Sequence, residues 1–281
     1  MTNTLKELII TFFNKMKNLF LRDASILLNM NEVSYSNNLN RLKKTFLICE
    51  NNKINIQITI GKEFYLNNKA DFDKIISNNL KKVKTITIHL TTSYDNLFSN
   101  DEDTKFFTLK LLELIKKVGK KIVGICIHPD HINSWKYLRN LNTKNNYLAI
   151  EVTDKKAKYG NKISQIQSIL KNNKFLKVVI DTSHIKELAE DGVMTFDKFY
   201  KEFKNYIVEA QISDFGNFYK LKKIKTSHSL LHLNKDKILK NQIKLLKKNK
   251  KKINFVIEGL IPFEKKSSSY LKKEIKYIKK V

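Results

Sequence analysis

ICIHPDH at residues 125–131 sets the pattern on which the fold depends, a short apolar run followed at once by histidine and aspartate. Four later runs also lead into polar, chemically active residues: LAIEV at 148–152, VVIDTSH at 178–184, VEAQISD at 208–214 and FVIEG at 255–259. A buried strand of a parallel sheet has the composition of such a run. The sequence therefore places metal-binding or proton-transferring side chains where several strands end.

Eight apolar runs alternate with helical patterns along the chain. Strands are expected at 24–30, 54–60, 84–90, 122–128, 147–152, 177–181, 206–213 and 253–258. Apolar residues at helical spacing separate several of these runs, as in FFTLKLLELIKKV at 106–118 and KISQIQSILKN at 162–172. Strands that alternate with helices form parallel sheets, and eight such units close into a barrel of about 250 residues. The sequence therefore predicts an α/β fold, a (β/α)8 TIM barrel in a single domain.

The amino-terminal stretch LKELIITFFNKMKNLFL at 5–21 has apolar residues at helical spacing. Charged residues interrupt it well short of the roughly 20 apolar residues that a membrane span requires. We therefore expect an amphipathic helix over 1–22, packed across the closed end of a barrel domain at 23–281, and no membrane partner. Attachment of this helix to a membrane surface is the less favoured alternative.

The composition is that of a folded protein, because 42% of the 281 residues are hydrophobic and can build a full core. The two cysteines, Cys49 and Cys126, lie far apart in sequence and lack the CxxC spacing of a metal or redox motif. This usage is typical of a reducing compartment, so the expected location is cytoplasmic. We expect a monomer.

The formal net charge of +27 predicts salt-dependent attraction to polyanions, although lysines on solvated helix faces account for most of it. Two loops on the expected open face of the barrel are rich in lysine, and the second of them also carries aromatic residues. The lysines in these loops are Lys155, Lys156 and Lys158 after the fifth strand, and Lys220, Lys222, Lys223 and Lys225 after the seventh. Basic and aromatic side chains together favour binding to a nucleic-acid backbone and its bases.

Histidines, carboxylates and one amide lie at or just beyond the ends of six successive strands. They are His89, His128, Glu151, Asp181, His184, Gln211, His228 and Glu258. In a TIM barrel the carboxyl ends of all strands meet on one face, which carries the active site. Imidazoles mixed with carboxylates suit zinc or manganese. The sequence therefore predicts a metal site at the open end of the barrel.

At these positions the chain resembles the xylose-isomerase-like TIM-barrel superfamily, and within it endonuclease IV, also called AP endonuclease family 2. The matching segments are HLTTSYDNL at 89–97, CIHPD at 126–130, IEVTDKKAKYG at 150–160, IDTSH at 180–184, QISD at 211–214 and IEGLIP at 257–262. The resemblance implies a hydrolase that incises damaged double-stranded DNA at abasic sites, in DNA repair, with two or three zinc ions.

The resemblance also implies roles for individual residues. The implied ligands are His89 and His128 for one ion, Glu151 bridging to a second ion held by Asp181 and Glu258, and His184 and His228 for a third. Glu151 and Glu258 would also be catalytic, because either carboxylate can orient or deprotonate a water molecule. Tyr94 would stack near the lesion or pack at the rim.

Two positions depart from the endonuclease IV pattern. Gln211 stands where the family has a ligand histidine, and Thr226 stands where it has an aspartate two residues before the last histidine. The glycine-histidine signature of the first strand is also absent. These departures leave open an alternative, a sugar isomerase or epimerase of the same superfamily that uses one Mn²⁺. Its ligands would be Glu151, Asp181, Gln211 and Glu258. A third possibility is a barrel that has lost catalysis and only binds nucleic acid.

Overall fold

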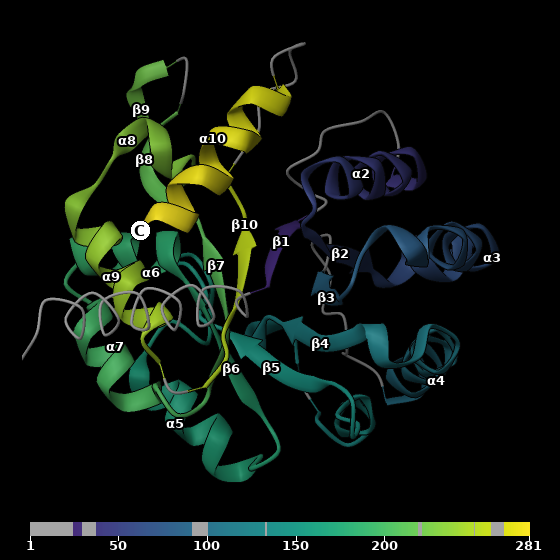
Figure 1. Ribbon diagram of the computed structural model, residues 1–281. Coiled ribbons are helices and arrows are strands. Elements are labelled where there is room, and N and C mark those ends of the chain that lie inside the picture. Colours follow the sequence, from purple (N-terminus) through teal and green to yellow (C-terminus); the bar gives the residue numbers. More distant parts are fainter. Residues whose placement is uncertain are drawn as a thin grey trace, which may run out of the picture.

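The computed structural model describes residues 25–29, 38–91, 101–132, 134–218, 221–249, 251–259 and 267–281 (Figure 1). Eight parallel strands close into a barrel in the order β1-β10-β7-β6-β5-β4-β3-β2. Their bounds are β1 Ile26–Asn29, β2 Asn55–Gly61, β3 Ile86–Thr91, β4 Ile122–Ile127, β5 Tyr147–Glu151, β6 Lys177–Asp181, β7 Ile207–Ile212 and β10 Asn254–Ile257. The predicted TIM barrel is confirmed, and all eight expected strands form.

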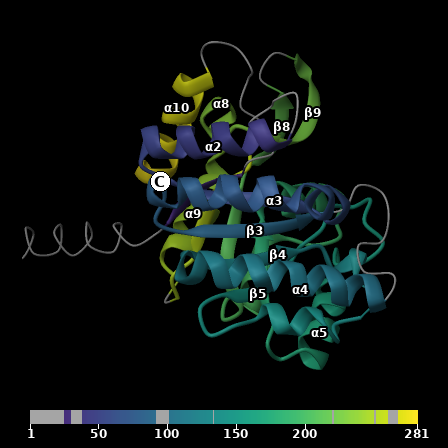
Figure 2. The same cartoon turned by 90° about the vertical axis from the view of Figure 1, so that its right-hand side faces the viewer.

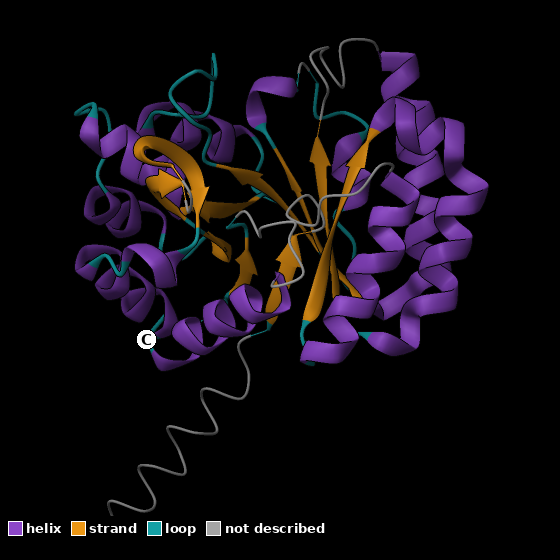
Figure 3. Cartoon of the chain, turned by 90° about the horizontal axis from the view of Figure 1, so that it is seen from above, coloured by secondary structure: helices purple, strands orange, loops and turns teal. Residues whose placement is uncertain are grey.

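Helices surround these strands on the outside of the barrel (Figure 3). They are α2 Asn38–Asn52, α3 Lys62–Asn79, α4 Asp101–Val118, α5 Ile163–Asn172, α6 Thr182–Glu190, α7 Phe196–Phe203, α8 Leu231–Asn234, α9 Lys237–Lys247 and α10 Ser267–Lys280. Between β4 and β5 the described chain forms only the 3-10 turns η4 Pro129–His131 and η5 Leu138–Leu141. The expected alternation of strands with helices is therefore interrupted there.

The two faces of each strand have different chemistry, because successive side chains point to opposite sides. One face packs under the helices in a large apolar core that includes Ile58, Ile88 and Ile150. The alternate positions point into the barrel, where the small cluster of Cys126, Ala149 and Val179 lies among polar side chains. The residues that end the strands continue this inward row, so their side chains converge at one end of the barrel.

The segment after β7, which we expected to be a loop, forms an antiparallel hairpin of β8 Asp214–Phe218 and β9 Leu221–Ser229. The hairpin contacts α6. Strand β8 also contacts α8, which in turn contacts α10 (Figure 2). Lys186 of α6 anchors the base of the hairpin, because its Nζ donates to Asp214 at 2.7 Å and to Asp236 at 2.8 Å. The expected loop is thus a structured wall beside the barrel mouth.

Several predictions fall outside the described residues, namely the helix over 1–22, Tyr94 and Lys220. They stay predictions. Among the helices that the structure describes, none combines the length and the apolar composition that a membrane span requires.

Candidate metal centre

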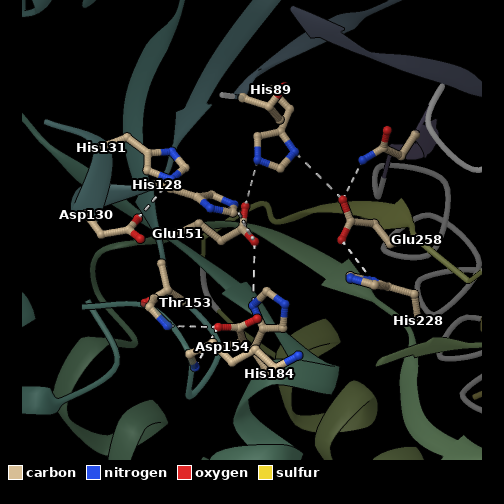
Figure 4. Close-up of a pocket in the computed structure, with 14 residues that line it drawn as sticks. His89, His128, Asp130, His131, Glu151, Thr153, Asp154, His184, His228 and Glu258 are labelled. Carbon is tan, nitrogen blue, oxygen red and sulfur yellow. Dashed lines mark hydrogen bonds and ion pairs between the residues drawn. The ribbon is translucent and has the colours of Figure 1, made fainter. Parts of the chain in front are cut away.

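A cavity of about 460 Å³ opens at the carboxyl ends of the strands (Figure 4). Six of the eight predicted ligands line it: His89, His128, Glu151, His184, His228 and Glu258. The other two, Asp181 and Gln211, are completely buried and adjacent across β6 and β7. The structure therefore brings together side chains spread over residues 89–258, as the barrel topology requires.

The first ligand group is His89, His128 and Glu151, from three successive strand ends. Each residue offers one ligand atom, and these atoms lie within 4.8 Å of one another. Glu151 Oε2 is 3.2 Å from His89 Nε2, and its Oε1 is 3.4 Å from His128 Nε2. The Cys126 thiol donates to Oε2 of Glu151 from inside the barrel at 3.3 Å. The buried carboxylate of Glu151 therefore faces a different histidine with each of its oxygens.

This group has strongly shifted pKa values. Burial lowers the pKa of His89 to about 4, so its ring is neutral. Burial also opposes the charged form of His128, but the nearby Glu151 carboxylate outweighs it and raises the pKa of His128 to about 9. Burial alone would raise the pKa of Glu151, whereas His128 and His89 hold it well below its usual range. In the protein without metal, a positive charge on His128 therefore faces an ionised Glu151.

The second ligand group is Asp181, His184 and His228, again with ligand atoms within 4.8 Å of one another. Asp181 caps α6, because its Oδ1 accepts from the backbone N–H groups of Ser183 at 2.7 Å and His184 at 2.9 Å. His184 Nδ1 lies 3.0 Å from the carbonyl oxygen of Val152, which fixes Nδ1 as the donor. Nε2 of His184 points to the other side of the ring and lies 3.9 Å from Asp181 Oδ2, and the carboxylates of Asp181 and Glu151 raise the pKa of His184 against the effect of burial.

His228 reaches the second group from β9, with a backbone φ of 63°. This left-handed conformation is uncommon for a residue with a side chain and is found preferentially at functional sites. The His228 ring contacts that of His184, with 5.6 Å between their centres, and its Nδ1 lies 3.7 Å from Glu258 Oε2. The hairpin therefore supplies a candidate ligand that no barrel strand carries.

Glu258 lies near a histidine of each group, and Gln211 lies beside Asp181 of the second group. Glu258 Oε1 is 4.0 Å from His89 Nδ1 and accepts from Asn29 Nδ2 at 2.6 Å. Gln211 is fully buried, and neither its Oε1 nor its Nε2 has a hydrogen-bond partner among the described residues. A buried amide without partners costs about 1–3 kcal/mol. Because Gln211 lies beside Asp181, a metal ion or substrate bound there could supply the partner that its amide lacks among the described residues.

The donor set fits divalent metal ions. Buried atoms without a hydrogen-bond partner in the described chain include both ring nitrogens of His89, Nε2 of His128 and Oδ2 of Asp181. Such atoms are rare in folded proteins, and coordination to a metal ion would give each of them a partner. Imidazole nitrogens and carboxylate oxygens are ligands of zinc and manganese. The residues present can hold ions at both groups.

The basic residues at the rim differ in their surroundings. Lys155 is held by acidic partners, with its Nζ 3.1 Å from Asp191 and 3.8 Å from Glu187. Lys156 lines the cavity, and Lys158 is exposed. The lysines at 222, 223 and 225 lie on β9 of the hairpin. Among the first three, Lys156 is therefore the best placed to meet a bound ligand.

Several residues of the cavity wall, among them Asn29, Asp130 and His131, were not among the predicted ligands. Asn29 ends β1, and Asp130 and His131 follow His128 in η4. His128, Asp130 and His131 also form a third group with ligand atoms within 4.8 Å of one another. The signal for Asn29 was present in the sequence, since a polar residue ends its strand as in the others. The turn of the backbone at η4 is what brings Asp130 towards His128.

Metal affinity is expected to rise as the pH is raised from 6 towards 9. A histidine must lose its proton to bind a metal, and the pKa of His128 is raised to about 9, so protons compete with the ion below that pH. The stability of the metal-free protein is expected to change with pH in the opposite direction, and to fall as the pH rises. The raised pKa stabilises the fold fully below about 6.5, and this contribution is lost as the pH rises through about 9.

Calorimetric titration with Mn²⁺ at several pH values checks the first expectation, with the heat of buffer ionisation used to count released protons. A His128→Gln variant is the control, since its affinity should respond less to pH. An affinity that falls between pH 6 and 8 would contradict the expectation.

Comparison with known proteins identifies the architecture. No protein-family model matches the sequence, and no curated protein matches it. Among solved structures, the chain is similar to a xylose isomerase domain protein from Alicyclobacillus acidocaldarius, with a TM-score of 0.62, 10% identity and coverage of 91% of this chain and 99% of the other. The chain is also similar to D-allulose 3-epimerase from Methylomonas sp. in complex with D-allulose, with a TM-score of 0.63, 10% identity and coverage of 92% of this chain and 97% of the other.

A third similar structure is a xylose isomerase-like TIM barrel protein from Mycobacterium smegmatis in complex with magnesium. Its TM-score is 0.56 at 12% identity, with coverage of 92% of this chain and 97% of the other. The likeness in each case spans nearly the whole of both chains. The protein thus shares the fold of the xylose-isomerase-like TIM barrels.

Proposed function

We propose that the protein is a metal-dependent phosphodiesterase that incises DNA at abasic sites, with the barrel mouth as its active site. The observation that carries the proposal is the pair of ligand groups, each made of two histidines and one carboxylate. Glu151 Oε1 lies 3.8 Å from His184 Nδ1, so the groups adjoin. Two adjoining groups support more than one ion. Sites with two metal ions are common in enzymes that cleave phosphodiesters.

Bound divalent ions supply positive charge to the scissile phosphate and lower the pKa of water. The protein's own groups do the rest. Oε1 of Glu258 accepts from Asn29 and Oε2 faces His228, so the Glu258 carboxylate lies at the cavity, where it could accept a proton from water. Glu151 orients the histidines of the first group. A nucleotide that has lost its base needs the least energy to leave the duplex and enter the cavity.

Lys156→Ala is expected to weaken binding to duplex DNA and to reduce its salt dependence, whereas Lys155→Ala changes both less. Each lost phosphate contact lowers the slope of log affinity against log salt by about 0.9. Lys156 lines the cavity, but Lys155 is paired with Asp191 and Glu187. Fluorescence anisotropy at several salt concentrations checks this. Equal effects of the two substitutions would show that Lys156 makes no special contact.

The test of the proposal is to purify the protein, count its bound metal ions and offer it a duplex with one abasic site. Two or three ions per chain with incision at that site would support it. An intact duplex of the same sequence is the matched substrate control. Metal ions without incision would contradict the phosphodiesterase, and the absence of both metal and incision would favour a barrel that only binds nucleic acid.

A second candidate is a sugar isomerase or epimerase with a single divalent ion, and the named activity of the epimerase with the same fold favours it. The buried amide of Gln211 favours it too, because Gln211 lies beside Asp181 and can bind an ion through its oxygen. In this case Glu151 and Glu258 would move a proton at the carbon beside a carbonyl. One ion per chain and interconversion of ketose epimers would establish it.

A further inference from the structure

Asn29, the last residue of β1, contacts Glu258 directly. It is 2% exposed, and its Nδ2 donates to Glu258 Oε1 at 2.6 Å and to Gln57 Oε1 at 2.9 Å. Its Oδ1 accepts from the Thr59 hydroxyl at 3.0 Å. An ionised carboxylate only accepts hydrogen bonds, so the NH₂ end of the amide must face Glu258. The Asn29 side chain is therefore held at both ends.

Behind Asn29, a chain of buried hydrogen bonds crosses the barrel interior. Gln57 Nε2 donates to Glu209 Oε1 at 2.8 Å, and the Tyr147 hydroxyl donates to Glu209 Oε2 at 2.9 Å. Asn254 Nδ2 donates to the Tyr147 oxygen at 3.1 Å. These residues come from β1, β2, β7, β5 and β10, so five strands share the network. A buried network whose polar groups all have hydrogen-bond partners holds each of its side chains in one position.

We propose that Asn29 is a positioning residue that sets how Glu258 is presented to a metal ion. The amide occupies Oε1 of Glu258, and the other oxygen is left 3.7 Å from His228 Nδ1, at the cavity. Rotation of the carboxylate would break a short hydrogen bond to an amide that the barrel interior holds in place. Outer hydrogen-bond partners of this kind orient metal-binding carboxylates in other proteins.

The inference rests on the metal-binding part of the proposed function and does not depend on the substrate. Loss of the amide would leave Oε1 of Glu258 without its donor from the barrel interior, and the carboxylate would sample several orientations. Substitutions of outer-shell partners typically weaken metal binding by about 10–100-fold. We therefore expect Asn29→Ala and Asn29→Leu to weaken Mn²⁺ binding by about that factor, with the leucine keeping the buried volume.

The matched control is Asn254→Ala. Asn254 is a buried asparagine of the same network, on the strand that leads to Glu258, but its described hydrogen bond goes to Tyr147. If Asn29 had only a structural role, both alanine substitutions would lower the melting temperature and leave Mn²⁺ affinity alone. If it positions Glu258, only the substitutions at Asn29 weaken the affinity.

The experiment uses the full chain, with Mn²⁺ titrated under electron paramagnetic resonance and melting followed by circular dichroism. Weaker binding by a folded Asn29 variant, with unchanged binding by Asn254→Ala, supports the inference. Unchanged binding by Asn29→Ala or Asn29→Leu overturns it. If neither Asn29 variant folds, Thr59→Val replaces them, because it removes only the hydroxyl that orients Asn29. Weaker Mn²⁺ binding by Thr59→Val then supports the inference, and unchanged binding overturns it.

The outcome for the proposed function stays distinct. Weaker Mn²⁺ binding at Asn29 together with a wild-type protein that does not incise abasic DNA would keep the inference and reject the phosphodiesterase. If the wild-type protein incises abasic DNA and the Asn29 variants bind Mn²⁺ as tightly as the wild type, the phosphodiesterase is kept and the inference is rejected. A wild-type protein that binds no divalent ion would overturn both.

Discussion

Glu151→Gln is expected to slow incision of abasic DNA by at least about 10³-fold, which corresponds to about 4 kcal/mol of transition-state stabilisation. Glu151 lies within 4 Å of three histidines, at 3.2 Å from His89, 3.4 Å from His128 and 3.8 Å from His184. Glutamine keeps the shape of the side chain but removes the charge that these rings and any bound ions face. The rate under single-turnover conditions checks the expectation.

The fold is expected to survive this substitution. Glutamine fills the same buried volume, and without the Glu151 charge that raises its pKa the His128 ring can lose its proton, so that no unpaired charge stays buried. Glu187→Gln is the matched control, because Glu187 is a buried carboxylate on α6 outside the ligand groups. It should cut at nearly the wild-type rate. Incision by Glu151→Gln at the wild-type rate would remove Glu151 from the mechanism.

Removal of divalent ions by a chelator is expected to abolish activity and to lower the melting temperature. The ligand groups contain buried carboxylates and imidazoles that lose their charge-balancing partner when an ion leaves. An ion present at a thousand times its dissociation constant stabilises the native state by about 4 kcal/mol. Returning Zn²⁺ or Mn²⁺ should restore both properties. Differential scanning calorimetry with and without the chelator measures the change in stability.

The control for metal removal is a variant without the first ligand group, His89→Ala with His128→Ala. Its melting temperature should respond less to the chelator than that of the wild-type protein. An equal response would place the stabilising ion elsewhere, at Asp181, His184 and His228. Activity that persists in the chelated wild-type protein would contradict a metal-dependent mechanism.

Much of the fold was predictable because a parallel barrel leaves a strong mark on sequence. The outward face of each strand must be apolar to pack against helices, as Ile58, Ile88 and Ile150 do. The inward face ends in a polar residue where the strand meets solvent at the barrel mouth. That is why the sequence placed His89 and Glu258 at strand ends on one face of the barrel, and both line the cavity although 169 positions separate them.

The exceptions depend on contacts between distant segments. The hairpin of β8 and β9 was expected to be a loop, because its lysine-rich sequence lacks the alternation of a half-buried strand. Its pairing is supported by packing against α6 and by the contacts of Lys186. The stretch after β4 was expected to alternate like the others, but it forms 3-10 turns that place Asp130 near His128.

The sequence alone determined the barrel, the order of its strands and the set of polar residues at their ends, because hydrophobic periodicity is a local property of the chain. Only the tertiary structure decided how those residues pair. The hydrogen bond from Asn29 to Glu258 and the lack of a partner for the Gln211 amide among the described residues each depend on strands far apart in sequence, and the left-handed backbone of His228 lies in a hairpin that was expected to be a loop. Such pairings follow from the register and closure of the barrel, and a local pattern does not encode them.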